Sequence, residues 1–172
     1  MNEIREIVTK AIVGKGKKTI RIKENVIPRY EAFSILGVWV INHEFEAALS
    51  DNNRVELVGN FEINIWFSHD DNTKTDIAKK VVGYTNTINT RQIVKEVNAN
   101  SQDVIVRIVQ QPTCTNAKIV NSEIEVDIVF EVVAEVIGET KMMVTVFTQM
   151  ESYEPIDDNF ENEINENFIQ PN

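Results

Sequence analysis

Alternating hydrophobic and polar positions dominate this chain and predict an all-β protein. Across residues 55–68 the apolar side chains fall on every second position, as in a strand with one buried face. Val58 and Trp66 interrupt the polar positions, so we expect part of that second face to be covered as well. The residues predicted to face the core are Val55, Leu57, Phe61, Ile63, Ile65 and Phe67.

A second strand and a turn flank this run. Residues 33–45 are apolar and rich in β-branched and aromatic types, which favours a strand. Residues 69–72 read His-Asp-Asp-Asn and have turn chemistry, and residues 73–75 begin a returning strand. The centre of the chain is therefore predicted to be a pair of strands followed by a hairpin.

The longest alternating run covers residues 123–137 and follows a shorter predicted strand at 103–110. Gly138 and Glu139 are expected to turn the chain, so that residues 141–148 return antiparallel. The opposite face of the long run is acidic, and we interpret its carboxylates as solvated residues or as protection of a sheet edge. The residues predicted to be buried are Ile124, Val126, Ile128, Phe130, Val132, Ala134 and Val136.

Several strands separated by short polar breaks predict an antiparallel β-sandwich or barrel-like fold. The same succession of strands occurs before residue 90 and after residue 100, which is consistent with two related β-modules. We expect a short N-terminal amphipathic segment at residues 1–23, a β-rich body at 24–148 with halves at 24–97 and 103–148, and a disordered acidic tail at 149–172.

Residues 2–13 fit either a helix or a strand. Their apolar side chains have the spacing of an amphipathic helix, but residues 7–9 and 11–13 are also good strand formers. Such an apolar stripe docks on its own domain or on a neighbouring copy, and the sequence alone favours its own domain. The apolar residues are Ile4, Ile7, Val8, Ala11 and Ile12.

A basic segment follows, with Lys15, Lys17 and Lys18 at its start. It resembles a phosphate-binding loop only faintly, because Ala11 stands at the position of the first glycine and Lys18 at that of the Ser or Thr. A solvated basic strand or turn is the better interpretation. With an acidic tail at the other end, the chain is bipolar and would attract copies head to tail, less strongly as salt rises.

Composition narrows the classes of function. The net charge is −10, which disfavours nucleic acid as a partner. Seven acidic residues and no basic ones lie in residues 149–172, so 20 acidic and 17 basic residues remain in the rest of the chain. No signal peptide or apolar run long enough to insert into a membrane is visible, which predicts a soluble protein made in the cytoplasm. Cys114 is the single cysteine, so no disulfide forms within the chain.

Candidate chemistry is sparse. His43, His69 and Cys114 lack the spacing of a metal site or of a nucleophilic pair, so no metal, cofactor or catalytic residue is expected. Residues 69–72 offer oxygens at a turn, which leaves a small-ligand or cation-binding β-domain as an alternative. A hydrolase would need a histidine, an acid and a nucleophile brought together by the fold.

Six blocks of sequence resemble the outer spore coat morphogenetic protein E family of endospore-forming bacteria. They occur in order over nearly the whole chain and precede an acidic tail, and none of them is a catalytic motif. The blocks are IVTKAIVGKG at 7–16, SILGVWVINH at 34–43, NIWFS at 64–68, NTKT at 72–75, VQQPTC at 109–114 and AEVIGETK at 134–141.

The resemblance implies a structural scaffold and not an enzyme. Such proteins are made in the mother-cell cytoplasm, gather around the forespore, associate with themselves between the inner and outer coat and recruit outer coat proteins. The implied partners are further copies of this chain, other spore coat proteins and a basement-layer coat protein.

Given this resemblance, three sets of residues become candidates. Self-assembly is assigned to residues 2–23, recruitment to residues 149–172, and an interchain disulfide to Cys114. The self-assembly residues are Ile4, Ile7, Val8, Ala11, Ile12, Lys15, Lys17 and Lys18. The recruiting residues are Tyr153, Phe160, Glu161, Glu163 and Phe168.

Overall fold

The computed structural model describes residues 2–51, 53–94, 97 and 101–147, and these form an all-β protein. The chain divides into two units, Glu6–Met142 and a smaller one of Met1–Arg5 with Met143–Asn172. The strands are β1 (Asn2–Val26), β2 (Ser34–Ser50), β3 (Arg54–His69), β4 (Lys74–Asn89), β5 (Arg91–Gln92), β6 (Asp103–Val120) and β7 (Glu123–Phe147).

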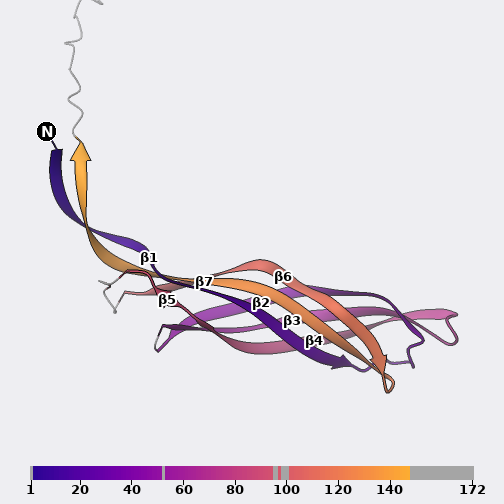
Figure 1. The fold of residues 1–172 in the computed structure, drawn as a ribbon. Coiled ribbons are helices and arrows are strands. Elements are labelled where there is room, and N and C mark those ends of the chain that lie inside the picture. The colour runs from indigo at the N-terminus through magenta and orange to yellow at the C-terminus, as the bar shows by residue number, and fades with distance from the viewer. Residues whose placement is uncertain (1, 52, 95–96, 98–100, 148–172) are drawn as a thin grey trace, which may run out of the picture. The chain divides into compact units, whose positions relative to one another are not determined.

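The strands form two antiparallel sheets, which confirms the predicted fold class (Figure 1). One sheet has the order β2-β3-β4 and the other the order β5-β1-β7-β6. In the first sheet Phe61 pairs with Val82, and in the second Val106 pairs with Ala134. Strand β1 runs through residue 23, so the segment assigned to self-assembly is continuous with the four-stranded sheet.

The core lies between the inner faces of the two sheets. The alternating residues of β3 and β7 that were predicted to be buried are all buried, because every second side chain of a strand faces the same side. Phe130 of β7 is fully buried and makes edge-to-face contacts with Phe61 and Tyr84 of the other sheet, with ring centroids 6.3 Å and 5.1 Å apart. The two sheets therefore share one hydrophobic core.

The edges of the two sheets approach each other on both sides of this core. On one side β1 lies against β4, where the Lys80 ammonium group is 2.8 Å from the Glu24 carboxylate and Gly16 packs against the Asn89 backbone. On the other side β2 lies against β6, where His43 is close to the Gln111 side chain. The sandwich is therefore closed in the manner of a flattened barrel.

The structure decides one open alternative and corrects one prediction. Residues 2–13 are strand and not an amphipathic helix, because they pair in the sheet as part of β1. Residues 138 and 139 do not turn the chain, since β7 continues to Phe147. Gly138 is needed for close packing instead: a Cβ atom there would lie 2.9 Å from Val97 and 3.1 Å from Val13.

The turn between β6 and β7 offers a test of backbone strain. Asn121 and Ser122 both have positive φ, 47° and 67°, as a two-residue type I′ hairpin requires. Asn is well suited to the first position, but Ser at the second lacks the freedom of glycine. We expect Ser122→Gly to raise the free energy of unfolding by about 0.5–1 kcal/mol in urea denaturation. Ser122→Ala keeps the strain and should give no gain; an equal gain in both variants would contradict this reasoning.

Candidate interaction surfaces

The N-terminal part of β1 exposes large apolar side chains. Ile4 is 67 % exposed and Val8 63 % exposed, and Ile7 and Ile12 are also exposed, while Ala11 is half-buried. Val8 and Ile12 share a face of the strand, because they are four residues apart. In the chain alone these side chains are in contact with water, and burying them against another molecule would be favourable.

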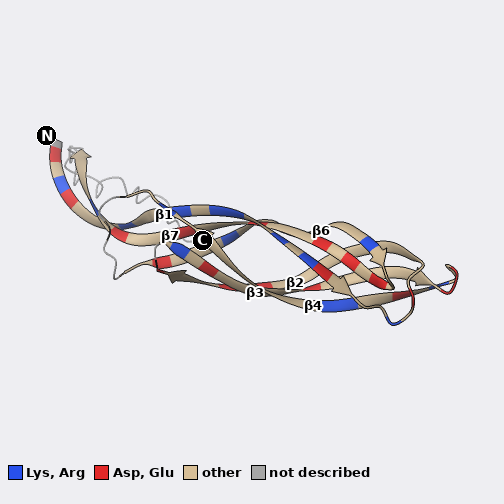
Figure 2. Ribbon diagram, turned by 60° about the horizontal axis from the view of Figure 1, so that its bottom comes forward, with Lys and Arg blue, Asp and Glu red and all other residues tan. Residues whose placement is uncertain are grey.

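The lysines of β1 lie beside the acidic face of β7 (Figure 2). Lys17 forms an ion pair with Glu131, and the Lys15 ammonium group is 3.6 Å from the Glu135 carboxylate. The Lys23 ammonium group is 3.4 Å from Glu125. These cross-strand pairs explain the alternation of charge on both strands, since β1 and β7 are neighbours in the sheet.

Strand β6 adds cations on the other side of β7. The Arg107 guanidinium is 2.6 Å from Glu135, and the Lys118 ammonium is 3.1 Å from Glu125. Lys118, followed by Lys23, holds the pKa of Glu125 below its usual range. The interpretation of these acids as edge protection is therefore wrong, because β7 is an inner strand. Four of its carboxylates, those of Glu125, Asp127, Glu131 and Glu135, form ion pairs with neighbouring strands.

The outer face of the three-stranded sheet carries an exposed apolar patch, here called the two-tryptophan face. Trp66 of β3 is opposite Ile77 of β4 and is 44 % exposed, and Val58 on the same face is 49 % exposed. None of the described residues covers Val58 or Trp66, contrary to the expectation for these two positions. Its exposed apolar residues are Trp39, Ile41, Val58, Trp66, Ile77 and Val81.

His43 is half-buried, and its ring packs against aromatic residues of the core. A bulge in β2, where Asn42 has a positive φ of 53°, turns the ring inward. The ring nitrogen Nε2 is 2.7 Å from the Tyr84 hydroxyl, and the ring makes an edge-to-face contact with Phe130 at 5.2 Å. Burial lowers the pKa of His43 and raises the pKa of Tyr84 to about 12.

This environment predicts a loss of stability in mild acid. Folding favours neutral His43, whereas the unfolded chain takes up a proton below pH 6.5, so the free energy of unfolding falls as the pH drops from 6.5 through the lowered pKa. We expect the urea midpoint to decrease more steeply between pH 7.5 and pH 5 in the wild type than in His43→Gln. Parallel pH profiles for the two proteins would contradict a contribution from this histidine.

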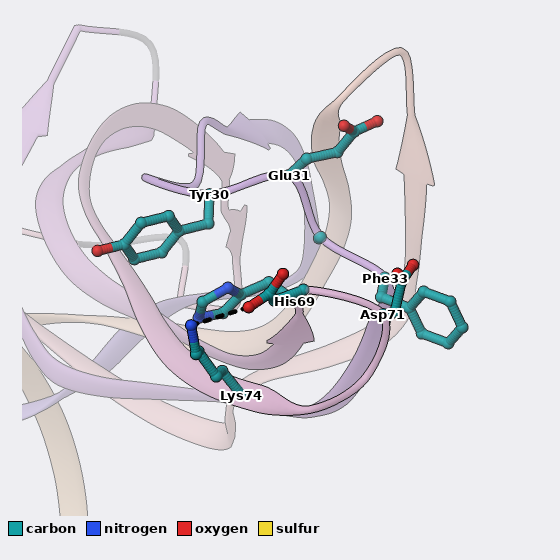
Figure 3. A pocket seen from close by; sticks show the side chains of 8 residues that line it. Tyr30, Glu31, Phe33, His69, Asp71 and Lys74 are labelled. Atoms are coloured by element: carbon teal, nitrogen blue, oxygen red, sulfur yellow. Dashed lines mark ion pairs between the residues drawn. The ribbon is translucent and has the colours of Figure 1, made fainter.

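His69 lies in a cavity of about 660 Å³ at the turn between β3 and β4 (Figure 3). Its ring stacks on Tyr30, with centroids 4.3 Å apart and planes 11° from parallel. The Phe33 amide donates a hydrogen bond to the Ser68 carbonyl at 2.7 Å, which ties the segment before β2 to the end of β3. The Lys74 ammonium is 2.8 Å from the Asp70 carboxylate.

Sequence reasoning found His69 and the turn but missed the other wall of the cavity. Tyr30, Glu31 and Phe33 lie in the connector between β1 and β2, to which the sequence analysis assigned no binding role. Two aromatic residues flanking an acid were the available signal. Their proximity to His69 depends on tertiary structure, so no local pattern predicts it.

Cys114 is half-buried on strand β6. Its thiol Sγ donates a hydrogen bond to the Asn116 carbonyl at 3.3 Å. Burial raises the pKa of the Cys114 thiol, and the negative charge of Asp127 adds to this effect. The thiol is therefore largely protonated at neutral pH.

The remaining predictions concern the acidic tail, metal ligands and membrane-spanning segments. The tail residues Tyr153, Phe160, Glu161, Glu163 and Phe168 lie outside the described residues. Across the part of the chain that is described, no three His, Cys, Asp or Glu side chains gather as metal ligands. No helix in that same part has the length and apolarity needed to span a membrane.

Comparison with protein families gives a match. No curated protein matches the chain, and no solved structure matches it. The family described as outer spore coat protein E (CotE) matches residues 3–171, which is nearly the whole chain. This agrees with the resemblance carried by the six blocks of sequence. The chain therefore belongs to the outer spore coat protein E family.

Proposed function

We propose that this spore coat protein is a non-catalytic scaffold that assembles with copies of itself and recruits other coat proteins. Family membership supports a place in the coat. The observation that carries self-assembly is the exposure of Ile4, Val8 and Ile12 on β1, a strand that is otherwise part of the sheet. In this proposal, copies gather in the mother-cell cytoplasm around the forespore and bury these side chains against one another.

Sedimentation velocity and negative-stain electron microscopy of the full chain test the assembly. The wild type is expected to form large particles, and Val8→Asp to shift the population to small species, because a buried unpaired carboxylate is costly. Thr85→Asp is the matched control, since it adds the same charge to an exposed position of β4, outside the segment assigned to self-assembly. A wild type that is monomeric throughout, or assembly in Val8→Asp as in the wild type, would overturn the proposed surface.

We propose that the acidic tail at 149–172 recruits outer coat proteins and a basement-layer coat protein. Its aromatic residues Tyr153, Phe160 and Phe168 among carboxylates, including Glu161 and Glu163, suit an acidic peptide that orders on a partner. A chain ending at Thr148 should still assemble but should leave the outer coat proteins unbound in co-sedimentation. Full retention of those proteins by the shortened chain would refute this assignment.

We propose further that Cys114 forms an interchain disulfide once the assembled coat meets an oxidant. Its raised pKa leaves little thiolate at neutral pH, so cross-linking should be slow there and faster in mild alkali. Non-reducing gels of assembled protein should show a dimer band that is absent from Cys114→Ser. Monomer alone after oxidation at pH 9 would disprove the cross-link.

A further inference from the structure

The cavity at the turn between β3 and β4 combines aromatic rings with carboxylates. Three acids and one lysine line it, and the lysine is already neutralised, because Lys74 and Asp70 form an ion pair. Glu31 and Asp71 have no basic partner within ion-pair distance among the described residues. The cavity therefore has two uncompensated negative charges, which disfavours an anionic ligand and favours a cation.

His69 is the second feature that points to a ligand. The residue is only 8 % exposed, and within the described part of the chain neither ring nitrogen has a hydrogen-bond partner. Neither ring nitrogen of His69 is fully enclosed, because among the described residues only Ser101 Oγ is a fully enclosed polar side-chain atom without a partner. Since His69 lines the cavity, its ring nitrogens are accessible from there. Buried polar groups are normally paired, so the unpaired imidazole of His69 is available to form a hydrogen bond with a ligand.

The aromatic residues define the shape of the ligand. Figure 3 shows Tyr30 on one side of His69 and Asp71 on the other. Tyr30 is 46 % exposed and Phe33 58 % exposed, so each offers surface to a bound group. A planar cation stacks on such rings and forms paired hydrogen bonds with a carboxylate, which a spherical ammonium does less well.

A metal ion fits this cavity less well. Nowhere in the described residues do three potential metal-ligating side chains come together, and the acids of the cavity are no exception. A cation that carries its own hydrogen-bond donors is satisfied by two separated carboxylates and an imidazole. The guanidinium group of arginine has five such donors in one plane.

We propose that this cavity is a binding site for a guanidinium cation, which stacks on an exposed aromatic ring of the cavity and is held by the carboxylates of Glu31 and Asp71 with His69 as a hydrogen-bonding partner. The site is built entirely from one chain and does not depend on the scaffold function. The guanidinium comes either from a free small molecule or from an arginine side chain of another polypeptide.

Titration of the full chain with N-acetyl-arginine amide, followed by NMR, tests the site. Arginine should bind saturably and shift the ring signals of Tyr30 and His69, and N-acetyl-citrulline amide, a neutral analogue of the same shape, should bind about tenfold more weakly. The lysine analogue should also be weaker. Equal binding of citrulline, or no shift with arginine in any form, would overturn the proposal.

A second arm distinguishes the two sources of the cation. A flexible Gly-Ser peptide with one central arginine should bind at least as tightly as the free amide if the natural ligand is a polypeptide. Tighter binding of the free amide than of the peptide assigns the site to a small molecule. Both results support a guanidinium site. Binding of N-acetylglucosamine or of Zn²⁺ in place of arginine would refute it.

Two charge-removing variants identify the carboxylates. Asp71→Asn and Glu31→Gln should each weaken arginine binding about tenfold while the shape of the cavity is retained. Asn tolerates the positive φ of 55° at position 71, so the turn should fold normally. Asp51→Asn, which removes one acid from another hairpin turn, is the matched control and should bind as the wild type does. Unchanged affinity in both cavity variants would disprove the site.

Discussion

Phe130→Ala should lower the free energy of unfolding by about 3–5 kcal/mol, the largest loss expected from any single truncation in this protein. Phe130 is fully buried on β7 and its ring contacts His43, Phe61 and Tyr84, which belong to the other sheet. Removing the ring leaves a cavity where the two sheets are held together. Urea denaturation followed by circular dichroism measures the change.

The same strand offers a control for this truncation. Phe147 lies at the end of β7 and is 75 % exposed, so Phe147→Ala removes the same atoms from a solvated position. Its effect should stay within about 0.5 kcal/mol. Similar losses in the two variants would mean that Phe130 does not join the sheets as described.

Gly16→Ala should also destabilise the protein, by about 1–3 kcal/mol. A Cβ atom at residue 16 would collide with the Asn89 carbonyl oxygen and would lie 3.2 Å from the Ile88 side chain. The collision is with backbone, so relief requires β1 to move away from β4 at the edge that closes the core. Thermal and urea denaturation both measure this cost.

Gly83→Ala provides the comparison for Gly16→Ala. Gly83 lies on β4, and the nearest atom to a Cβ there is the Gly59 carbonyl oxygen at 4.0 Å. Alanine is accommodated at this position and lowers the entropy of the unfolded chain, so stability should be unchanged or slightly higher. If both alanines cost the same, the loss would come from glycine in strands generally and not from the contact between β1 and β4.

Sequence periodicity predicted the elements with one buried face and failed where a residue has a tertiary role. The alternation in β3 and β7 identified their core residues, because every second side chain of a strand faces the same side and the apolar set must face the core. Gly138 was misread as a turn, since a glycine that permits close packing looks the same in sequence as one that permits a bend. Residues 2–13 were ambiguous because the same apolar residues suit a helix and a strand.

The candidate sites were less predictable than the fold. His69 and its turn were visible in the sequence, but Tyr30, Glu31 and Phe33 meet them only because the connector before β2 hydrogen-bonds to Ser68. The pairing of the basic residues of β1 with the acids of β7 was also missed, since the partners are more than a hundred residues apart. Self-assembly and recruitment remain predictions for residues 2–23 and 149–172.

The paired charges on the four-stranded sheet have a consequence for the conditions under which copies associate. Lys15, Lys17 and Lys23 are neutralised by β7 of their own chain, so they are poor attachment points for an acidic tail on a neighbour. Each copy of the chain has a net charge of −10, so without that attraction the copies repel one another. Counter-ions shorten the range of that repulsion, so moderate ionic strength should favour the layered state, in contrast to a head-to-tail charge model.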